Sequence, residues 1–410
     1  MAEAARAAAQ QVLRIDTAVI NQALQTVASL LLQDKAAIIE ANQKDLAAAN
    51  KKNMAASFID RLMMDDARLE GLAASVRSIA ALPDPVHQIL ETTKRPNGLQ
   101  IDKVSVPIGV LGMIYESRPN VTIDAAALCL KSRNGVILRG GSDSFHTARA
   151  LFTLFLRALQ KHDLPTALIQ MPETTDRRFV DEMLKTRDAI DVLIPRGGKN
   201  LTERVMNEAV MPVFAHLDGN CHFYWHGSAD SAMAQAVILN AKLRRTGICG
   251  ALESLLIDRA VAPDAMTAVL QALHDDGCRI RGDKDICAIF TGAEPATEAD
   301  WHTEYLDKIL SVKMVNGVED AAAHINHYGS HHTDGILSDD EETVRYFQTA
   351  VDSAIVVHNA STQFADGGEF GMGAEIGIGT GKLHARGPVG LNQLCTFKYI
   401  VRGTGQTRPV

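Results

Sequence analysis

The feature that most constrains this chain is a repeated alternation, from residue 107 onward, of short apolar runs with longer stretches of helical character. Apolar strands that alternate with helices form parallel sheets, because the crossover helices cover the faces of the sheet. The first series of runs lies at residues 108–115, 135–139, 167–171, 190–194 and 212–216. The second series lies at residues 252–257, 288–290, 309–315, 335–337 and 354–357. We therefore predict an α/β chain with two lobes, each built on a parallel-rich sheet.

Residues 1–80 precede this pattern and have a helical composition, with Ala, Leu, Gln and Glu frequent. Asp16 and Thr17 offer an N-cap, and Pro83 and Pro85 end the run, because proline cannot continue a helix. The segment is predicted to be a set of helices that supports the first sheet.

Two segments far apart in the sequence, residues 98–106 and 394–401, alternate apolar and polar side chains as half-exposed strands do. They could pair with each other, and a ribbon with free edges attracts a partner subunit. We predict a small β-ribbon over residues 96–106 and 386–410 that serves oligomerisation, as a homo-dimer or homo-tetramer.

Composition excludes several classes of protein. The chain has 410 residues, a net charge of −8 and no basic stripe with interleaved aromatic residues, so it lacks the footprint of a nucleic-acid-binding protein. No stretch approaches the ~18 apolar residues of a membrane helix, and the N-terminus lacks the apolar core of an export signal. The six cysteines form no CxxC pair, which fits reduced cytosol. We expect a cytoplasmic protein with neither nucleic-acid nor membrane partners.

Cys249 lies in a turn of small residues that follows three cations, Lys242, Arg244 and Arg245. The thiolate, and not the thiol, attacks a carbonyl carbon, and nearby positive charge favours the thiolate. We interpret Cys249 as a nucleophile that carries acyl groups. The alternative is a small buried residue, which is the ordinary role of a lone cysteine.

Two glycine turns follow predicted strands, Arg139-Gly-Gly-Ser at 139–142 and Arg196-Gly-Gly-Lys at 196–199. In parallel sheets ligands bind at the carboxyl ends of strands, where glycines let the backbone approach a phosphate and the next helix offers free N–H groups. Each turn could hold a phosphate or could be a tight turn only. The usual dinucleotide fingerprint is missing, because residues 109–112 lack its spacing.

The segment Tyr-Glu-Ser-Arg-Pro-Asn at 115–120 also leaves a predicted strand and places Arg118 and Asn120 at the same edge. The amide of Asn120 could donate to an oxyanion, as in acyl-transfer enzymes. It could equally cap the helix that is predicted to begin at Val121.

Six segments together resemble the gamma-glutamyl phosphate reductase family, a branch of the aldehyde dehydrogenase superfamily. The segments are residues 106–122, 138–142, 216–220, 241–254, 371–377 and 382–388. They occur in order over nearly the whole chain, and the strings at 116–120 and 382–388 are specific to this branch. Two residues depart from the family pattern: Thr246 stands where the family usually has Pro, and Gly250 where it usually has Asn. Both bear on rate or rigidity more than on reaction type.

The resemblance implies an aldehyde-dehydrogenase-like fold and the NADPH-dependent reduction of L-glutamate 5-phosphate to L-glutamate 5-semialdehyde, the second step of proline biosynthesis. It implies an NADP-binding domain over residues 1–95 and 107–240 and a catalytic domain over 241–385. A thioester on Cys249 would form as phosphate leaves. Association with glutamate 5-kinase is a further expectation, because the kinase makes the unstable acyl phosphate.

The resemblance also implies roles for individual residues. Catalysis falls to Cys249 and Asn120, and substrate binding to Arg118, Arg245 and Glu375. The expected cofactor-binding residues are Arg139, Gly140, Ser142, Arg196, Gly197, Gly198 and Glu304. Arg139 stands where relatives place a lysine against the adenosine ribose, which fits the 2′-phosphate of NADP. No metal site is expected, and His222, His226, His324, His327, His331 and His332 are interpreted as surface or structural residues.

Aldehyde-oxidising relatives carry a water-activating Glu in the segment that matches residues 216–220, and this chain has none there. Its absence favours acyl phosphate reduction, although His216 or Asp218 could act as a base. The alternatives are an oxidising or CoA-acylating aldehyde dehydrogenase with the same thiol, a non-catalytic nucleotide-binding scaffold, and a cysteine hydrolase.

Overall fold

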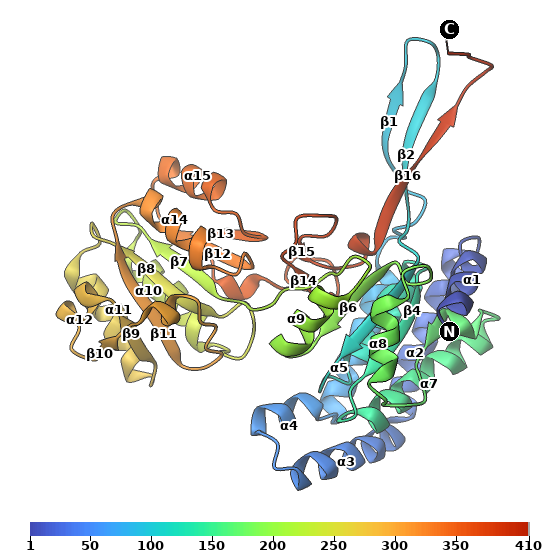
Figure 1. The fold of residues 1–410 in the computed structure, drawn as a ribbon, viewed down its shortest axis with the longest axis horizontal. Coiled ribbons are helices and arrows are strands. Elements are labelled where there is room, and N and C mark those ends of the chain that lie inside the picture. The colour runs from blue at the N-terminus through green and yellow to red at the C-terminus, as the bar shows by residue number, and fades with distance from the viewer. Residues whose placement is uncertain (409–410) are drawn as a thin grey trace. The chain divides into compact units, whose positions relative to one another are not determined.

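The computed structural model describes residues 1–408, apart from the side chains of residues 56 and 57, and divides by its contacts into two compact units (Figure 1). Unit 1 comprises Met1–Ala215, Gly371–Gly377 and Val389–Val410. Unit 2 comprises His216–Phe370 and Ile378–Pro388. No helix among the described residues is long and apolar enough to cross a membrane.

The core of unit 1 is a four-stranded parallel sheet in the order β5-β4-β3-β6. Its strands are β3 (Val110–Tyr115), β4 (Gly135–Gly140), β5 (Ile169–Gln170) and β6 (Val192–Arg196). The central strand β3 is buried along its whole length, as expected for a strand covered on both faces. Four of the five predicted runs are thus strands. Residues 212–216 are not: only a single bridge joins Leu193 to Val213, because Pro212 lacks the N–H that a strand would donate.

Helices precede and surround this sheet (Figure 1). They are α1 (Ala2–Val12), α2 (Thr17–Gln33), α3 (Lys35–Lys51), α4 (Ala56–Leu62), α5 (Asp66–Ala81), α6 (Val121–Lys131), α7 (Phe145–Lys161), α8 (Arg178–Lys185) and α9 (Lys199–Glu208), with a short 3-10 turn at Thr166–Leu168. In α2, Ile20, Leu24, Val27 and Leu31 recur at helical spacing and are all fully buried. The side chain of Asp16 accepts a hydrogen bond from the Ala18 N–H at 2.7 Å, so the predicted N-cap is present.

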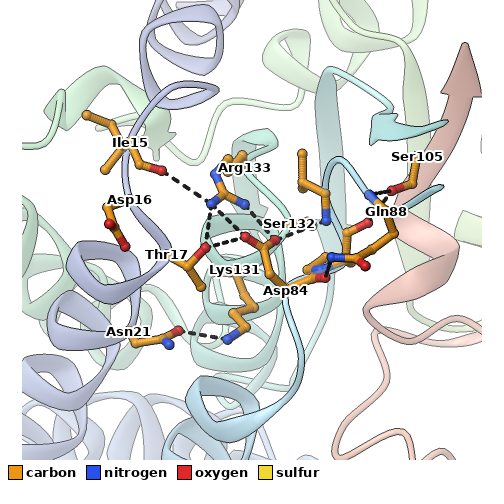
Figure 2. Close-up of polar contacts among 12 residues, drawn as sticks. Ile15, Asp16, Thr17, Asn21, Asp84, Gln88, Ser105, Lys131, Ser132 and Arg133 are labelled. Atoms are coloured by element: carbon orange, nitrogen blue, oxygen red, sulfur yellow. Dashed lines mark hydrogen bonds and ion pairs between the residues drawn. The ribbon is translucent and has the colours of Figure 1, made fainter. Parts of the chain in front are cut away.

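A partly buried ion pair joins the first helices to the chain that leads into the ribbon (Figure 2). Arg133, only 4% exposed, donates to both carboxylate oxygens of Asp84 at 2.7 and 2.8 Å. It also donates to the carbonyl of Ile15 and to Thr17, whose hydroxyl contacts Asp84. Burial alone would raise the pKa of Asp84, but hydrogen bonds from Arg133, Thr17 and the Val86 N–H outweigh it and lower the pKa to about 2.

The ribbon is a three-stranded antiparallel sheet of β1 (Ile89–Lys94), β2 (Gln100–Pro107) and β16 (Cys395–Arg402), with β2 in the middle (Figure 1). The predicted pairing of the two distant segments is confirmed. We had not predicted β1 and had placed it in the cofactor domain, because it is largely polar and exposed and shows no alternation. It forms because a turn closed by the Arg95 N–H and the Leu99 carbonyl, 2.8 Å apart, folds it back on β2.

Unit 2 contains a seven-stranded parallel sheet in the order β10-β9-β11-β8-β7-β12-β13. The strands are β7 (Cys221–Trp225), β8 (Leu252–Asp258), β9 (Arg279–Gly282), β10 (Ala293–Pro295), β11 (Ile309–Val315), β12 (Thr333–Leu337) and β13 (Ile355–His358). The helices are α10 (Ser231–Leu243), α11 (Pro263–Asp275), α12 (Lys284–Ile289), α13 (Glu298–Trp301), α14 (Val318–Tyr328) and α15 (Glu341–Ala350). Short pieces at Thr362–Phe364, β14 (Ile378–Gly379), β15 (Gly387–Pro388) and Asn392–Leu394 complete the elements of the chain.

Successive side chains of the central strands pack on opposite faces of this sheet. Phe223 and Trp225 of β7 join the cluster formed with α10, α11 and α12, whereas Tyr224 between them joins the cluster formed with α14 and α15. Both faces are therefore apolar, which explains why β7 and β8 are buried at every position.

Two predictions for unit 2 were wrong. Residues 288–290 end a helix instead of forming a strand, because the Asp283 side chain accepts from the N–H groups of Asp285 and Ile286 and starts α12. We had also placed residues 216–240 with the first lobe. They lie in unit 2, since β7 pairs with β8 and β12 and α10 packs on the same sheet.

The ion pair of Asp84 gives a prediction for stability. We expect Asp84→Asn to lower the free energy of unfolding of unit 1 by roughly 2–3 kcal/mol at pH 7, since its carboxyl has a pKa of about 2 in the folded chain. Because its pKa is lowered in the folded chain, the Asp84 carboxylate contributes fully to stability above its unfolded pKa near 3.8. This contribution is lost as the pH falls from there through about 2, so the difference between Asp84→Asn and wild type should shrink in that window. Urea unfolding followed by circular dichroism measures it.

Asp66→Asn is the matched control. Its ion pair with Lys35 is on the surface, with the Asp66 side chain 72% exposed, and should contribute little. Equal effects of the two substitutions at pH 7 would contradict the prediction.

Candidate active site

The candidate nucleophile Cys249 lies half-buried in the turn between α10 and β8. Because β8 begins at Leu252, the thiol is at the amino end of the strand. The sequence predicts ligands at the carboxyl ends of the strands of the first lobe. In unit 2 the thiol is instead carried by a helix-to-strand connection, and in a parallel sheet such connections lie at the amino edge.

Three contacts fix the backbone of Cys249 within unit 2. A Cβ added to Gly219 would lie 2.1 Å from the carbonyl oxygen of Cys249 and 2.6 Å from its Cα, so only glycine fits there. The Sγ of Cys221 donates to the same carbonyl at 3.1 Å. Glu304, which we expected near the nicotinamide ribose, accepts from the Gly219 N–H at 2.9 Å and thus holds the glycine beside the thiol.

The cations before Cys249 have partners that the sequence did not indicate. Lys242 donates to Glu253 at 2.6 Å, and both side chains are fully buried. Burial raises the pKa of Glu253 to about 7, although Lys242 opposes the shift. Arg244 donates to Gln363, whose own amide caps the Ala241 carbonyl at 2.7 Å. Lys242 and Arg244 therefore have structural partners, Arg244 and Arg245 are both exposed, and activation of the thiol by these cations stays a prediction.

Two histidines lie beside the thiol. The Sγ of Cys249 and one ring nitrogen each of His216 and His332 all lie within 4.8 Å of one another, and the two rings meet edge-on with centroids 5.0 Å apart. The Nδ1 of His216 donates to the Ile378 carbonyl at 2.8 Å. His332 is fully buried directly before β12, and its Nδ1 lies 2.9 Å from the hydroxyl of Thr333.

Sequence reasoning left His216 open as a base and interpreted His332 as a surface or structural residue. The sequence signal for His332 was its position just before a strand, because this position places it at the same amino edge of the sheet as Cys249. His222 and His324 are also buried, and they serve the structure: the Nδ1 of His222 lies 2.9 Å from the Asn220 carbonyl.

In unit 1, the carboxyl ends of β3, β4 and β6 carry Arg118 and Asn120, the turn at 139–142 and the turn at 196–199, as expected. Asn120 stands at the N-cap position of α6, but its side chain makes no capping hydrogen bond. Its amide donates instead to Asp124 at 3.2 Å, so the capping alternative is wrong. Burial raises the pKa of Asp124 to about 6 against the opposing effects of Asn120 and Arg196.

The first glycine turn borders a small pocket at the carboxyl ends of β4 and β5. Gly140, Gly141, Phe145 and Pro172 are among its lining residues. Arg139 is buried, donates to the Thr175 carbonyl at 2.7 Å, and has an Nε without a hydrogen-bond partner within residues 1–408. Burial is the main cause that lowers the pKa of Arg139, and the nearby charge of Arg177 adds to it. Arg177 is a second cation that the sequence did not single out, while Ser142 is exposed at the turn.

The second glycine turn holds an anion from the chain itself. The Gly198 N–H donates to the carboxylate of Glu116 at 3.3 Å, and a Cβ on Gly197 would lie 2.6 Å from the same oxygen. Glu116 therefore takes the position at the start of α9 that we predicted for a phosphate. Arg196 is half-buried at the end of β6.

The predicted substrate residues fall in both units. Arg118 and Glu375 are half-buried in unit 1, and Arg245 is exposed in unit 2. At Gly250, one of the two departures from the family pattern, an added Cβ would lie 3.1 Å from the carbonyl of Thr362, which is a tight contact.

Comparison with known proteins identifies relatives over the whole chain. A family model described as the aldehyde dehydrogenase family matches residues 1–279. The gamma-glutamyl phosphate reductase of Brucella suis biovar 1 is 55% identical over 389 residues, which cover 95% of this chain and 92% of the relative. That of Erythrobacter litoralis is 53% identical over 405 residues, covering 99% and 96%.

Solved structures agree with these relatives. The gamma-glutamyl phosphate reductase of Thermotoga maritima superposes with a TM-score of 0.97 at 39% identity, covering 100% of this chain and 99% of that one. An acetylating aldehyde dehydrogenase from Geobacillus thermoglucosidasius has a TM-score of 0.71 at 18% identity, covering 100% and 97%. The second likeness shows the fold alone, and it confirms the predicted aldehyde-dehydrogenase-like architecture.

The buried pair beside the nucleophile gives a second prediction. We expect Lys242→Met to lower the free energy of unfolding of unit 2 by about 3–5 kcal/mol at pH 8, because buried Glu253 loses its cation and must either stay charged or take up a proton. Replacing both residues, as Lys242→Met with Glu253→Leu, should recover most of the loss. Urea unfolding followed by tryptophan fluorescence reports on this unit, since both tryptophans, Trp225 and Trp301, lie in it.

Lys308→Met serves as the control, because its ion pair with Asp276 is about half-exposed. A double variant that is less stable than Lys242→Met alone would refute the assignment of Lys242 to Glu253.

Proposed function

The chain belongs to the aldehyde dehydrogenase family, in its gamma-glutamyl phosphate reductase branch, and we propose that Cys249 carries the acyl group in its reaction. That reaction is the reduction of L-glutamate 5-phosphate to L-glutamate 5-semialdehyde with release of phosphate, the second step from glutamate to proline. A bound nicotinamide cofactor supplies the hydride. The alternative of an oxidising or CoA-acylating enzyme is not favoured, because the acetylating relative named above shares only 18% identity.

The observation that carries the proposal is the setting of the thiol. Cys249 is half-buried, its backbone is fixed by Gly219, and two imidazole nitrogens lie within 4.8 Å of its sulfur. The Nδ1 of His216 carries its proton toward a carbonyl, so its Nε2 is left as an acceptor. His216 is thus equipped to take the thiol proton as the thiolate forms.

The chemistry of the thiol follows from acyl transfer. The sulfur of Cys249 bonds to the acyl carbon, the carbon–oxygen bond to phosphate breaks, and phosphate leaves with the electron pair. A thioester remains on Cys249. After reduction the carbon–sulfur bond breaks, and the aldehyde and the thiolate are released. We propose that the Cys249 N–H and the Asn120 amide stabilise the oxyanion, and that Asp124, bonded to that amide, orients it.

The thioester must be kept from water. The segment 216–220 has no Glu to activate water, which protects the intermediate from hydrolysis. The Asp218 carboxylate in the same segment is the only acid there. We propose that His216 serves proton transfer with the thiol and that the segment has no hydrolytic role.

For the cofactor we propose NADPH, held in unit 1. The fit is supported by the buried Nε of Arg139, which lacks a hydrogen-bond partner among the described residues and lies next to the glycine turn of Gly140 and Gly141. Arg139 and Arg177 supply positive charge for a 2′-phosphate. Ser142 can donate from the same turn. Two further cofactor roles stay predictions: phosphate binding at Arg196, Gly197 and Gly198, and a contact with Glu304. Phosphate binding at the glycine turn requires that Glu116 move away.

For the substrate we propose that Arg118 and Arg245 bind its phosphate and carboxylate and that Glu375 binds its ammonium. We propose further that the chain forms a homo-dimer or homo-tetramer through the ribbon, where Ile89, Tyr399 and Val401 are exposed. Action in the cytoplasm and association with glutamate 5-kinase complete the proposal.

The proposed nucleophile is tested by Cys249→Ser. We expect phosphate-dependent oxidation of glutamate 5-semialdehyde with NADP⁺, the reverse reaction, to disappear while NADPH binding persists, because a hydroxyl is far less nucleophilic than a thiolate. Cys287→Ser is the control, since Cys287 is also half-buried in unit 2 but lies on α12. Turnover that continues without added phosphate would contradict the proposed reaction, and an active Cys249→Ser would contradict the nucleophile.

The proposed oxyanion donor is tested by Asn120→Ala. We expect kcat to fall about 10²–10³-fold with little change in NADPH affinity, as for other single oxyanion donors. Asp124→Asn should cost less, because it orients the amide without touching the substrate. If Asn120→Ala changed KM alone, Asn120 would be a binding residue and the assignment would fail.

A further inference from the structure

The group of Cys249, His216 and His332 has a composition that the proposed reaction does not explain. One sulfur and two imidazole nitrogens converge within 4.8 Å, all from unit 2 and all at the amino edge of its sheet. A thiolate needs at most one base, so the second imidazole is available for another role. Thiolate and imidazole are also the ligands that Zn²⁺ prefers.

We propose that Cys249, His216 and His332 form a binding site for Zn²⁺, and that the bound ion reversibly blocks the nucleophile. Binding replaces the thiol proton by the metal, so that a sulfur–zinc bond forms and one proton is released to solvent. No electron is transferred. The sulfur lone pair is then held by the ion and cannot attack a carbonyl carbon. The site does not depend on the proposed reaction, since the same ligands would bind zinc in an inactive chain.

The distances are compatible with zinc. Zinc bonds are about 2.3 Å to sulfur and about 2.0–2.1 Å to nitrogen, so tetrahedral ligand atoms are roughly 3.4–3.6 Å apart. The ligand atoms lie within 4.8 Å of one another, so a movement of roughly 1 Å is enough to bring them to these separations. Cys249 and His216 are only half-buried, and side-chain rotation can provide this movement. His332, which is fully buried, is the fixed member of the group.

The surroundings orient the ligands. The Ile378 carbonyl can only accept, so the Nδ1 of His216 carries the proton and its Nε2 is free to bind a metal. The Thr333 hydroxyl lies 2.9 Å from the Nδ1 of His332 and can fix that ring in the same way. The carboxylate of Glu304, bonded to the Gly219 N–H against the Cys249 backbone, adds negative charge that favours a cation.

The neighbouring Cys221 is not a fourth ligand. Its Sγ donates to the Cys249 carbonyl at 3.1 Å, so its S–H is committed to that hydrogen bond and we do not count it among the ligands. Three protein ligands then leave the fourth position for water, as in open zinc sites.

The test uses the intact chain with Co²⁺ and Zn²⁺ alone. Co²⁺ should give one equivalent of a near-ultraviolet sulfur-to-cobalt absorption, which Cys249→Ser abolishes and Cys287→Ser leaves unchanged. Zn²⁺ should slow the alkylation of Cys249 by iodoacetamide, and a chelator should restore it. His332→Ala and His216→Ala should each weaken Co²⁺ binding at least ten-fold.

His216→Ala keeps the test decisive if His332→Ala does not fold, because His216 is half-exposed and circular dichroism can verify its fold. The proposal is overturned if Co²⁺ absorption survives in Cys249→Ser, if Zn²⁺ does not protect Cys249 in the wild-type chain, or if His216→Ala binds as tightly as wild type. None of these readings needs catalytic turnover. An inactive chain that still shows them would refute the proposed reaction and leave the zinc site standing.

Discussion

The close approach of the Gly219 backbone to that of Cys249 is the constraint on which the arrangement of unit 2 depends. With no side chain between them, the loop before β7 and the turn before β8 share one rigid layer. The Sγ of Cys221 donates to the Cys249 carbonyl, and the carboxylate of Glu304 accepts from the Gly219 N–H, so both segments are also held by hydrogen bonds. The backbone of the reactive turn is therefore held against the loop before β7, and only the side chain of Cys249 is left to rotate.

Much of the architecture could be predicted from the sequence, because buried positions in strands and helices are apolar and recur at regular spacing. The apolar runs of β3, β8 and β11 indicated parallel strands, and the alternation in β2 and β16 indicated a ribbon. Strand β1 could not be found this way, since its stability comes from pairing with β2 and its own side chains are exposed. Residues 288–290 were predicted as a strand because they are apolar, but three residues are too few to distinguish the period of a strand from that of a helix. They lie at the end of a helix that begins after Asp283.

The site was predictable in part. Cys249 and Asn120 stood out because their residue types suit acyl transfer, and the strand ends of unit 1 followed from a general rule for parallel sheets. The partners of these residues could not be foreseen. Lys242 is bound to Glu253, the turn at Gly198 is bound to Glu116, and His332 directly precedes a strand more than eighty positions after Cys249. Contacts of this kind depend on strand order, which no local pattern contains.

The ribbon of unit 1 has a consequence for biosynthesis. The carboxylate of Asp102, fully buried in β2, is held by Thr92 of β1 and by Arg402 of β16, which lies 300 positions later in the sequence. While the ribosome is still making unit 2, β16 does not yet exist, so one edge of β2 is unpaired and the Asp102 carboxylate lacks Arg402. Unfinished chains on neighbouring ribosomes would then present matching strand edges to one another, so slow translation or crowded polysomes are the conditions under which this fold is most exposed to misassembly.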